Sequence, residues 1–373
     1  MTKKTDDDLG YMRNALTLAR RGLGQVWPNP AVGCVLVHDD DIVGRGWTQP
    51  GGRPHAETEA LARAGKRAGG ATAYVTLEPC SHHGRTPPCA HALIDAAISR
   101  AVIAVTDPNP RVDGDGLKML TEAGISVDLG LCAEEASQLN AGFFFRQSKN
   151  RPYVTLKCAS TIDARIATRS GDNQWITGDA ARNAGHLIRA THDAVLVGSL
   201  TALQDNPSLT CRLPGLEARS PVRIVLDGRM QLPLTHDLVV TAEDTPTWIV
   251  TLRPKSGDKA SRRDAYIGAG VKVIEVDPDQ NGHPDVAQAL SQLSDSGITR
   301  LMVEGGGQVA ASFISARMVD EIVWFRAPCI IGGDGLPALA GIGVDELLGA
   351  PRPFRMSTRT IGDDIVEHYR IQG

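Results

Sequence analysis

Residues 54–57 read Pro-His-Ala-Glu, and residues 77–89 read Leu-Glu-Pro-Cys-Ser-His-His-Gly-Arg-Thr-Pro-Pro-Cys. Together these stretches supply one carboxylate, one imidazole and two thiols: Glu57, His55, Cys80 and Cys89. A zinc ion held by three protein ligands keeps one tetrahedral position open for water, as catalytic zinc sites do. The pattern therefore predicts a zinc centre with His55, Cys80 and Cys89 as metal ligands and Glu57 as the catalytic residue.

The order His-x-Glu followed by Pro-Cys is typical of zinc deaminases, in which the glutamate moves protons and does not bind the metal. The usual Pro-Cys-x-x-Cys spacing is not kept, because eight residues separate Cys80 from Cys89. The cysteines can still meet if Cys80 leaves a strand over residues 71–77 and Cys89 opens a helix with a proline in its first turn. His55 similarly precedes a helical run over residues 56–67. We expect both segments to present helix N-termini to the ion, where thiolate is favoured.

The residue types predict a hydrolytic deamination. Zinc lowers the pKa of a bound water toward ~7, and Glu57 would take the water proton and deliver it to the departing amine. The product carries a carbonyl where an exocyclic amine stood. The alternative is a closed structural zinc site with His82, His83 or His91 as fourth ligand, but such a site has no use for the adjacent carboxylate.

Composition indicates an intracellular protein of two domains. The 373 residues exceed the ~250 to 300 at which a single core stops growing. A formal net charge of -4 gives no excess of basic residues that would indicate nucleic-acid binding. Seven cysteines, an odd count spread along the chain, do not indicate the paired disulfide framework of a secreted protein. The first residues lack the apolar core of a signal peptide, and no apolar run reaches membrane-spanning length. We expect a cytoplasmic protein.

The first half alternates helical and strand patterns. Met12, Leu16 and Ala19 mark one face of an opening helix. Further elements are expected as a hairpin over residues 31–37 and 42–47, a strand over 101–105, a helix over 117–123 and a strand over 125–127. Strands separated by helices predict a three-layer α/β/α sandwich.

Residues 143–152 interrupt this periodicity with an aromatic triplet, charges and a proline, so we place the domain boundary near residue 148 and expect domains over 1–147 and 148–373. The triplet is interpreted as packing at the domain junction. In the second half, near-continuous apolar strands typical of a sheet covered on both faces are expected at residues 153–159, 193–198, 222–227, 247–251, 271–276, 300–303 and 321–325.

A glycine turn follows the strand at 300–303 and opens a helix running to about residue 317. The turn reads Val303-Glu304-Gly305-Gly306-Gly307-Gln308. Backbone amides exposed at a helix N-terminus can cradle phosphate. A plain tight turn is an equal alternative for a lone glycine triplet, and the turn is not the G-x-G-x-x-G fingerprint.

These residues resemble the bifunctional riboflavin-biosynthesis family RibD, in which an N-terminal pyrimidine deaminase is fused to a C-terminal reductase similar to dihydrofolate reductase. On the deaminase side the matching segments are Asn29-Pro30-x-Val32-Gly33-Cys34, Pro54 to Glu57, Leu77 to Cys89 and Asp107-Pro108-Asn109-Pro110. On the reductase side they include Lys157-x-Ala159, Asp163-x-Arg165, Gln174 to Thr177, Thr201 to Arg212 and Glu304-Gly305-Gly306. The long inter-cysteine loop specifies this branch of the deaminases.

The resemblance implies roles for residues of the second half. NADPH would be contacted at Ala159, Trp175, Thr201, Asp205, Gly306 and Gly307. Substrate would be contacted at Asn173, Arg189, Leu209, Arg212 and Glu304. Arg189 and Arg212 suit a sugar phosphate, since a guanidinium offers paired donors to phosphate oxygens.

The resemblance implies two steps: removal of the 2-amino group from 2,5-diamino-6-(ribosylamino)pyrimidin-4-one 5'-phosphate, then NADPH-dependent reduction of the ribosyl group to ribityl. The implied protein is a homo-oligomer acting on this small molecule. Two positions depart from the family pattern: Ala164 replaces a usual glycine and Asn173 a usual serine. If position 164 needs a positive φ, alanine costs about 1 kcal/mol or more. A zinc deaminase with a non-catalytic C-terminal domain, and a nucleic-acid base deaminase, are the alternatives.

Overall fold

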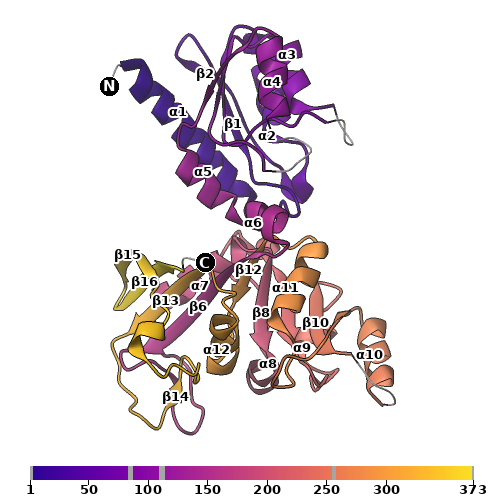
Figure 1. Ribbon diagram of the computed structural model, residues 1–373, viewed down its shortest axis with the longest axis vertical. Helices are drawn as coiled ribbons and strands as arrows, with labels where there is room; N and C mark the ends of the chain where they lie inside the picture. The colour runs from indigo at the N-terminus through magenta and orange to yellow at the C-terminus, as the bar shows by residue number, and fades with distance from the viewer. Residues whose placement is uncertain (1–2, 83–86, 109–113, 254–257, 372–373) are drawn as a thin grey trace. The chain divides into compact units, whose positions relative to one another are not determined.

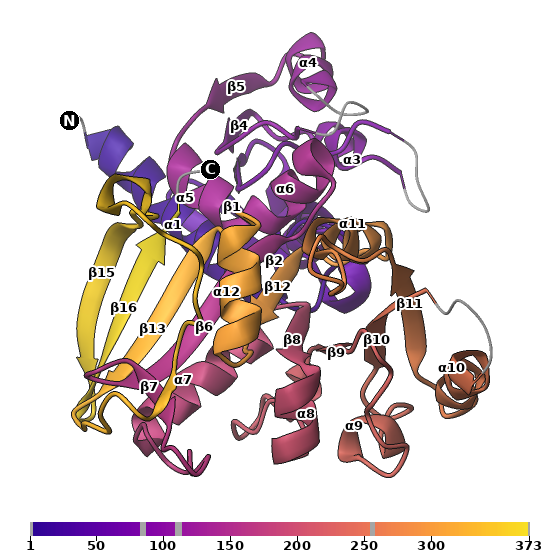
Figure 2. The same ribbon diagram turned by 60° about the horizontal axis from the view of Figure 1, so that its bottom comes forward.

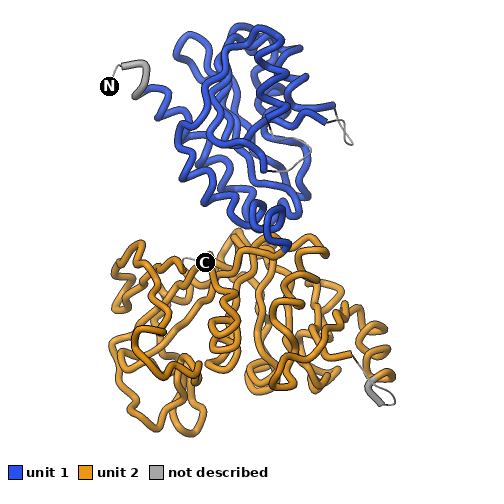
Figure 3. Tube along the Cα trace, in the orientation of Figure 1, with its two compact units in different colours: residues 1–150 blue, residues 151–373 orange. Residues whose placement is uncertain are grey.

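The protein is described here by a computed structural model that covers residues 3–82, 87–108, 114–253 and 258–371. The chain forms two compact units, Met1–Asn150 and Arg151–Gly373 (Figure 3). Among the described residues, none of the helices combines the length and the apolar character needed to cross a membrane. Each unit has its own sheet and its own core.

The first unit is built on a five-stranded sheet with the order β2-β1-β3-β4-β5. Its strands are β1 (Gly33–His38), β2 (Asp41–Trp47), β3 (Thr72–Val75), β4 (Arg100–Ile103) and β5 (Ser126–Leu129). Strand β1 pairs antiparallel with β2 and β3, whereas β3, β4 and β5 are parallel. The predicted hairpin and the three later strands are confirmed.

Helices cover both faces of this sheet (Figure 1). On one face lie α1 (Lys3–Ala19) and α5 (Ala133–Leu139), which share a buried cluster that includes Met12, Leu16 and Leu139. On the other lie α2 (Ala56–Ala64), α3 (Cys89–Asp95) and α4 (Asp115–Glu122), whose buried residues include Ala60, Leu93 and Leu120. The predicted three-layer sandwich is confirmed.

Three local expectations for this unit are wrong. The expected break in periodicity at residues 143–152 is helical as far as Lys149, because helix α6 (Ala141–Lys149) contains the aromatic triplet, and Phe143 packs in the core of the first unit. Packing of the triplet at the domain junction stays a prediction. The segment is helical because Phe143 and Phe144 pack against apolar residues of the first unit's core. Charged residues flank them in the sequence and interrupt the apolar pattern by which such a helix is recognised. Helix α2 ends at Ala64, followed by a 3-10 turn. Pro88 is the N-cap of α3 and not part of its first turn.

The second unit contains a nine-stranded sheet with the order β11-β10-β9-β8-β12-β6-β13-β16-β15. The first seven strands of this sheet order, from β11 to β13, are parallel to one another. In chain order they are β6 (Tyr153–Thr161), β8 (Ala194–Gly198), β9 (Val222–Leu226), β10 (Thr247–Leu252), β11 (Lys272–Val276), β12 (Arg300–Val303) and β13 (Glu321–Ala327). These seven strands were predicted from their apolar runs, and the structure confirms them.

The remaining strands are not predicted by the sequence patterns. An antiparallel hairpin of β15 (Phe354–Ile361) and β16 (Asp364–Arg370) completes the sheet beside β13. A separate pair joins β7 (Arg165–Ala167) to β14 (Leu336–Pro337). Strand β15 is an exposed edge strand rich in Arg, Ser and Thr, so it lacks the apolar pattern by which buried strands are recognised.

Helices flank the second sheet on both faces, with α7 and α12 on opposite sides of it (Figure 2). The helices are α7 (Asp179–Ala190), α8 (Ser199–Asp205), α9 (Asp237–Val240), α10 (Asp258–Gly268), α11 (Val286–Asp295) and α12 (Gly307–Ser315). Short 3-10 helices are η1 (Arg20–Gly22), η2 (Pro50–Gly52), η3 (Gly65–Ala68), η4 (Glu217–Arg219) and η5 (Leu347–Gly349). Helices α8 and α12 begin directly after the adjacent parallel strands β8 and β12, so both N-termini lie at the carboxyl edge of the sheet, where open α/β sheets bind ligands.

Candidate functional site

His55, Cys80 and Cys89 meet at one point of the first unit. His55 is the N-cap of α2, Cys80 follows β3, and Cys89 is the first residue of α3. The ligand atoms of the three side chains all lie within 4.8 Å of one another. Nδ1 of His55 is 3.2 Å from the Cys89 Sγ and 3.7 Å from the Cys80 Sγ. The imidazole thus directs Nδ1, rather than Nε2, toward the two sulfurs.

The chemistry of these donors fits zinc. One imidazole and two thiols form a recurrent three-ligand set of catalytic zinc sites. The Cys89 amide donates a hydrogen bond to the Cys80 Sγ over 3.3 Å. Hydrogen bonding from the Cys89 side chain, with further help from His55 and this amide, lowers the pKa of the Cys80 thiol to about 4. A sulfur already held as thiolate is prepared to bind a metal.

A fourth protein ligand is not seen in the described part of the chain. The group of possible ligands contains neither His82 nor His91. His82 instead lines the neighbouring cavity, and His83 lies outside the described residues. Three protein ligands leave the fourth position of a tetrahedral ion to water or substrate.

Glu57 lies beside this cluster, in the first turn of α2, but is not one of the possible ligands. The side chain is 3 % exposed. Burial and, to a smaller extent, the neighbouring Cys80 thiolate raise the pKa of Glu57 to about 7, against the opposing effect of His55. A carboxyl group that titrates near neutrality can both accept and return a proton.

A cavity of about 150 Å³ opens next to the cluster. Its walls carry both polar and apolar side chains, including Asn29, Val32, Thr48, Arg53, His55, Glu57, Leu77, Glu78, Cys80, His82, Asp107 and Phe143. The motif residues around positions 29, 54–57, 77–80 and 107 thus come together around one space. This volume and lining suit a small polar ring.

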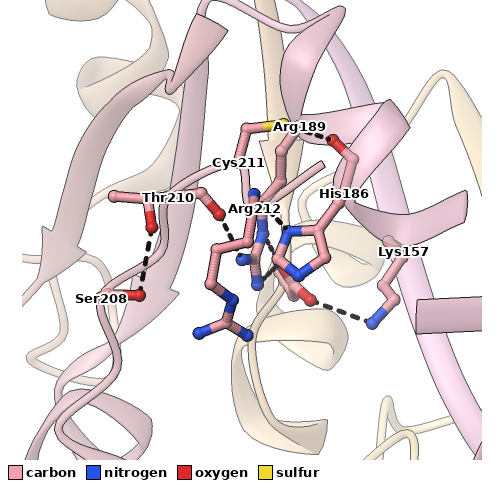
Figure 4. A network of polar contacts seen from close by, with 8 residues as sticks. Lys157, His186, Arg189, Ser208, Thr210, Cys211 and Arg212 are labelled. Atoms are coloured by element: carbon pink, nitrogen blue, oxygen red, sulfur yellow. Dashed lines mark hydrogen bonds and ion pairs between the residues drawn. The ribbon is translucent and has the colours of Figure 1, made fainter. Parts of the chain in front are cut away.

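A second polar cluster lies in the second unit and includes Lys157, Arg189 and Arg212 (Figure 4). Glu304 pairs with the first two of these side chains. Its carboxylate accepts a hydrogen bond from Lys157 Nζ over 2.9 Å and is paired with the guanidinium of Arg189 over 2.8 Å. Burial alone would raise the pKa of Glu304, but the two cations outweigh it and lower the pKa to about 2. Glu304 is therefore a fixed anion and not a proton donor at neutral pH.

The segment around residues 208–212 is held against this cluster. Arg189 donates to the Thr210 carbonyl over 3.0 Å, and the Arg212 amide donates to Nδ1 of His186 over 3.4 Å (Figure 4). Leu209 is buried and has a φ of +54°, a conformation that leucine seldom adopts. Strained residues of this kind often occur where a loop is shaped for a ligand.

The glycine turn places α12 close to other backbone segments. A Cβ at position 307 would lie 2.5 Å from the Pro337 carbonyl oxygen, and one at position 305 would lie 2.7 Å from Val309. Gly306 is the N-cap of α12 and lies beside the Thr201 hydroxyl, 3.7 Å from where a Cβ would be. Gly305 and Gly307 are therefore needed for close approach, and two expected cofactor positions, Thr201 and Gly306, are neighbours.

Comparison with known proteins gives a consistent result. Residues 152–366 match the family described as RibD C-terminal domain, and residues 5–105 match the cytidine and deoxycytidylate deaminase zinc-binding region. The riboflavin biosynthesis protein RibD of Bacillus amyloliquefaciens is 44 % identical over 95 % of this chain and 94 % of its own length. That of Escherichia coli is 40 % identical over 96 % of this chain and 98 % of its own. The chain belongs to the RibD family.

Solved structures agree with this assignment. The structure of Acinetobacter baumannii RibD has a TM-score of 0.88 at 35 % identity and covers 99 % of this chain and 100 % of its own. A structure from Thermotoga maritima, described as a diaminohydroxyphosphoribosylaminopyrimidine deaminase and 5-amino-6-(5-phosphoribosylamino)uracil reductase, has a TM-score of 0.86 at 34 % identity, covering 98 % and 99 %. The similarity therefore extends over both units.

The other residues expected from the RibD resemblance form no hydrogen bond with Glu304 among the described residues. Ala159 lies on β6, and Asp205 ends α8. Trp175 is 65 % exposed, with the Arg182 guanidinium 4.7 Å from its ring centre. Among the described residues, no hydrogen bond joins Asn173, Trp175 or Asp205 to Glu304. Their cofactor and substrate roles remain predictions.

Ala164, where the RibD pattern usually has glycine, has a φ of +58°. Its amide donates to the Thr161 carbonyl over 3.0 Å, and its carbonyl accepts from the Ala338 amide over 3.0 Å. The turn after β6 thus keeps the left-handed conformation despite the side chain. Position 164 therefore has the positive φ that favours glycine, and alanine is strained there.

Sequence reasoning did not assign site roles to Lys157 and His186. Lys157 is the only charged residue in the strand 153–161, and a lone cation in a buried strand indicates a specific anionic partner. His186 precedes Arg189 by three positions on α7, which places both on one face of that helix. Both signals are visible in the sequence once the strand and the helix are known.

Proposed function

We propose that this chain is a bifunctional enzyme of riboflavin biosynthesis. Its first domain, residues 1–147, hydrolytically deaminates 2,5-diamino-6-(ribosylamino)pyrimidin-4-one 5'-phosphate, and its second, residues 148–373, reduces the ribosyl group to ribityl with NADPH. The observation that carries the proposal is the convergence of His55, Cys80 and Cys89 beside the buried Glu57, at the wall of a cavity of about 150 Å³.

In the first domain, Nδ1 of His55 and the sulfurs of Cys80 and Cys89 would hold zinc. Zinc bound there supplies a Lewis acid that makes a water molecule nucleophilic near neutral pH. Glu57 takes a proton from the attacking water and gives it to the departing amino group, so that water and amine become carbonyl and ammonia. Its raised pKa, about 7, lets the same carboxyl perform both transfers.

In the second domain, NADPH supplies the hydride for reduction at C1' of the sugar. Glu304 is held ionised by Lys157 and Arg189, so it accepts hydrogen bonds from sugar hydroxyls. The Arg189 guanidinium is already committed to Glu304 and to Thr210, whereas the exposed Arg212 forms no ion pair within the described chain. Arg212 is thus the better of the two arginines for the substrate phosphate.

Other properties of the protein belong to the same proposal. Two free thiols at a metal centre, and seven free cysteines in all, favour a reducing, cytoplasmic location. Both faces of edge strand β15 are exposed, including Phe354 and Met356 at 63 % and 43 %, which favours a homo-oligomer that covers it. The formal net charge of -4 argues against nucleic acid as a substrate of the first domain.

The test is an assay of the zinc-loaded protein with the diaminopyrimidine ribosyl phosphate, following ammonia release and NADPH oxidation separately. Both signals are expected. Ammonia alone would leave a deaminase with a non-catalytic second domain. If neither ammonia release nor NADPH oxidation is observed, the diaminopyrimidine ribosyl phosphate is excluded as the substrate.

Glu57→Gln should abolish ammonia release while zinc content stays at the wild-type value and NADPH oxidation with the deaminated substrate persists. Loss of zinc in this variant would mean that Glu57 is a ligand and would contradict the assigned role. Glu59→Gln, on the same helix and 2.8 Å from Arg63 of its next turn, is the matched control.

A further inference from the structure

Glu78 is a buried carboxylate next to the metal cluster that the reaction itself does not use. It is 3 % exposed and lies between β3 and Cys80. Its backbone amide donates to the Val105 carbonyl over 2.9 Å, so the chain at Glu78 continues the pairing of β3 with the segment leaving β4. No lysine or arginine forms an ion pair with it in the part of the chain described here.

Three backbone amides satisfy this carboxylate instead. One oxygen, Oε2, accepts from the amides of Asp107 and Gly114, each over 3.2 Å. The other, Oε1, accepts from the amide of Gly116 over 2.9 Å. Hydrogen bonds from amides to an ionised carboxylate are stronger than neutral ones. Two of these amides belong to the start of α4, where the helix dipole also favours a negative charge.

Glu78 therefore joins three segments that are distant in sequence. Through its own backbone it is two residues from Cys80, a predicted metal ligand. Through Asp107 it holds the segment after β4, and through Gly114 and Gly116 it holds the first turn of α4. The approach is tight, because a Cβ at position 116 would lie 2.1 Å from the Pro79 carbonyl oxygen.

Both ends of this connection face the same cavity. Asp107 and Glu78 line it together with His55, Glu57 and Cys80. Asp107 is buried, so the position of its side chain follows the position of its backbone, which Glu78 holds. A ring bearing amino groups offers N–H donors that a carboxylate in the cavity wall can accept.

We propose, resting on the deaminase function above, that Glu78 is a positioning residue of the deaminase: it sets the location of the Asp107 wall of the cavity relative to the metal ligands. It neither binds the metal nor transfers a proton. Its removal should therefore weaken substrate binding and orientation while the metal centre stays intact.

Glu78→Gln is the most direct variant, because it keeps the shape of the side chain. An amide has only one acceptor oxygen, so its NH2 group must face at least one backbone N–H, whichever way it is turned. The variant loses either the Gly116 bond or the Asp107 and Gly114 bonds. Glu122→Gln is the matched control, since Glu122 ends the same helix α4 with its side chain 67 % exposed.

We expect Glu78→Gln to bind zinc at the wild-type ratio per chain and to raise the KM for the diaminopyrimidine by about tenfold to a hundredfold. Hydrogen–deuterium exchange should be faster in peptides covering Asp107, Gly114 and Gly116, and Glu122→Gln should match the wild type. Because Glu78 acts through Asp107, Glu78→Gln combined with Asp107→Asn should raise KM no more than Asp107→Asn alone.

An unchanged KM, or effects of the two substitutions that multiply, would overturn the proposal. If Glu78→Gln loses zinc, Glu78→Asp, which keeps the charge and both acceptor oxygens, is measured by the same criteria, and zinc loss in both variants would also overturn it. Failure of the deaminase function itself gives a different result: the wild type then releases no ammonia, while the exchange effect of Glu78→Gln persists.

Discussion

Replacing Ala164 by glycine should stabilise the second unit. Ala164 has a φ of +58° in the turn between β6 and β7. A left-handed conformation costs an L-residue other than glycine about 1–2 kcal/mol. Glycine avoids this cost but loses about 0.5–1 kcal/mol more backbone entropy on folding than alanine does. The net expectation is a gain of about 0.5–1 kcal/mol in the free energy of unfolding, provided that the turn keeps its shape.

The hydrogen bonds around Ala164 indicate that the turn keeps its shape in the glycine variant. Besides the bonds of Ala164 to Thr161 and Ala338, the Arg165 amide donates to the Thr161 hydroxyl over 2.9 Å. The Asp163 carboxylate accepts from the Thr161 hydroxyl over 2.5 Å and from the Gly332 amide over 2.7 Å. None of these bonds uses the methyl group of Ala164, so all of them can persist in the variant.

Calorimetry of the full chain measures the effect. For a domain of about 200 residues, the expected gain raises the Tm of the second unit by about 1–4 °C. Ala97→Gly, at a φ of +52° in the first unit, should instead raise the Tm of the first unit. Comparing the two variants then shows which calorimetric transition belongs to which unit. Ala350→Gly, at a φ of -67°, should act in the opposite direction through unfolded-state entropy alone. A loss of stability in Ala164→Gly equal to that in Ala350→Gly would refute the reasoning.

Three further substitutions probe the second unit. Asp205→Asn should lower NADPH-dependent turnover and leave ammonia release unchanged, and an unaltered reductase rate would remove Asp205 from the cofactor site. Glu304→Gln, which leaves the buried cations of Lys157 and Arg189 incompletely paired, should lower the unfolding free energy by about 3 kcal/mol and abolish NADPH oxidation; denaturant titration and the reductase assay measure the two effects. Burial lowers the pKa of His192 from 6.5 to about 4. Above pH 6.5 the folded and unfolded states are both neutral at His192; as pH falls toward 4 only the unfolded state gains the proton, so up to about 3 kcal/mol of stability is lost. Unfolding midpoints between pH 7 and pH 4 should therefore fall less steeply in His192→Gln than in the wild type, and parallel slopes would contradict this.

The sequence by itself predicted most of the central architecture. Apolar runs identified the strands from Tyr153 to Ala327, because strands buried on both faces must be apolar along their length. The metal centre was also predictable, because its chemistry depends on residue types. An imidazole, two thiols and an adjacent carboxylate are informative even before their distances are known. The RibD resemblance added the order of the two activities.

Other features could not be predicted from local patterns. The β15–β16 hairpin has a polar, exposed strand at the sheet edge, and only its pairing with β13 makes it part of the sheet. The helix over the aromatic triplet forms because Phe143 packs in the core of the first unit. In both cases tertiary contacts outweigh local propensity.

The sequence determined which functional groups this protein has, and the tertiary structure decided which of them work together. The Glu304 carboxylate pairs with Arg189 and Lys157, which lie 115 and 147 residues earlier in the chain. Glu78 is bonded to amides 29 to 38 residues later in the chain. Backbone amides carry no side-chain identity, so no residue pattern announces them as partners. Whether a buried carboxylate binds a metal, transfers a proton or holds a wall in place depends on the donors that the fold brings within about 3 Å of it.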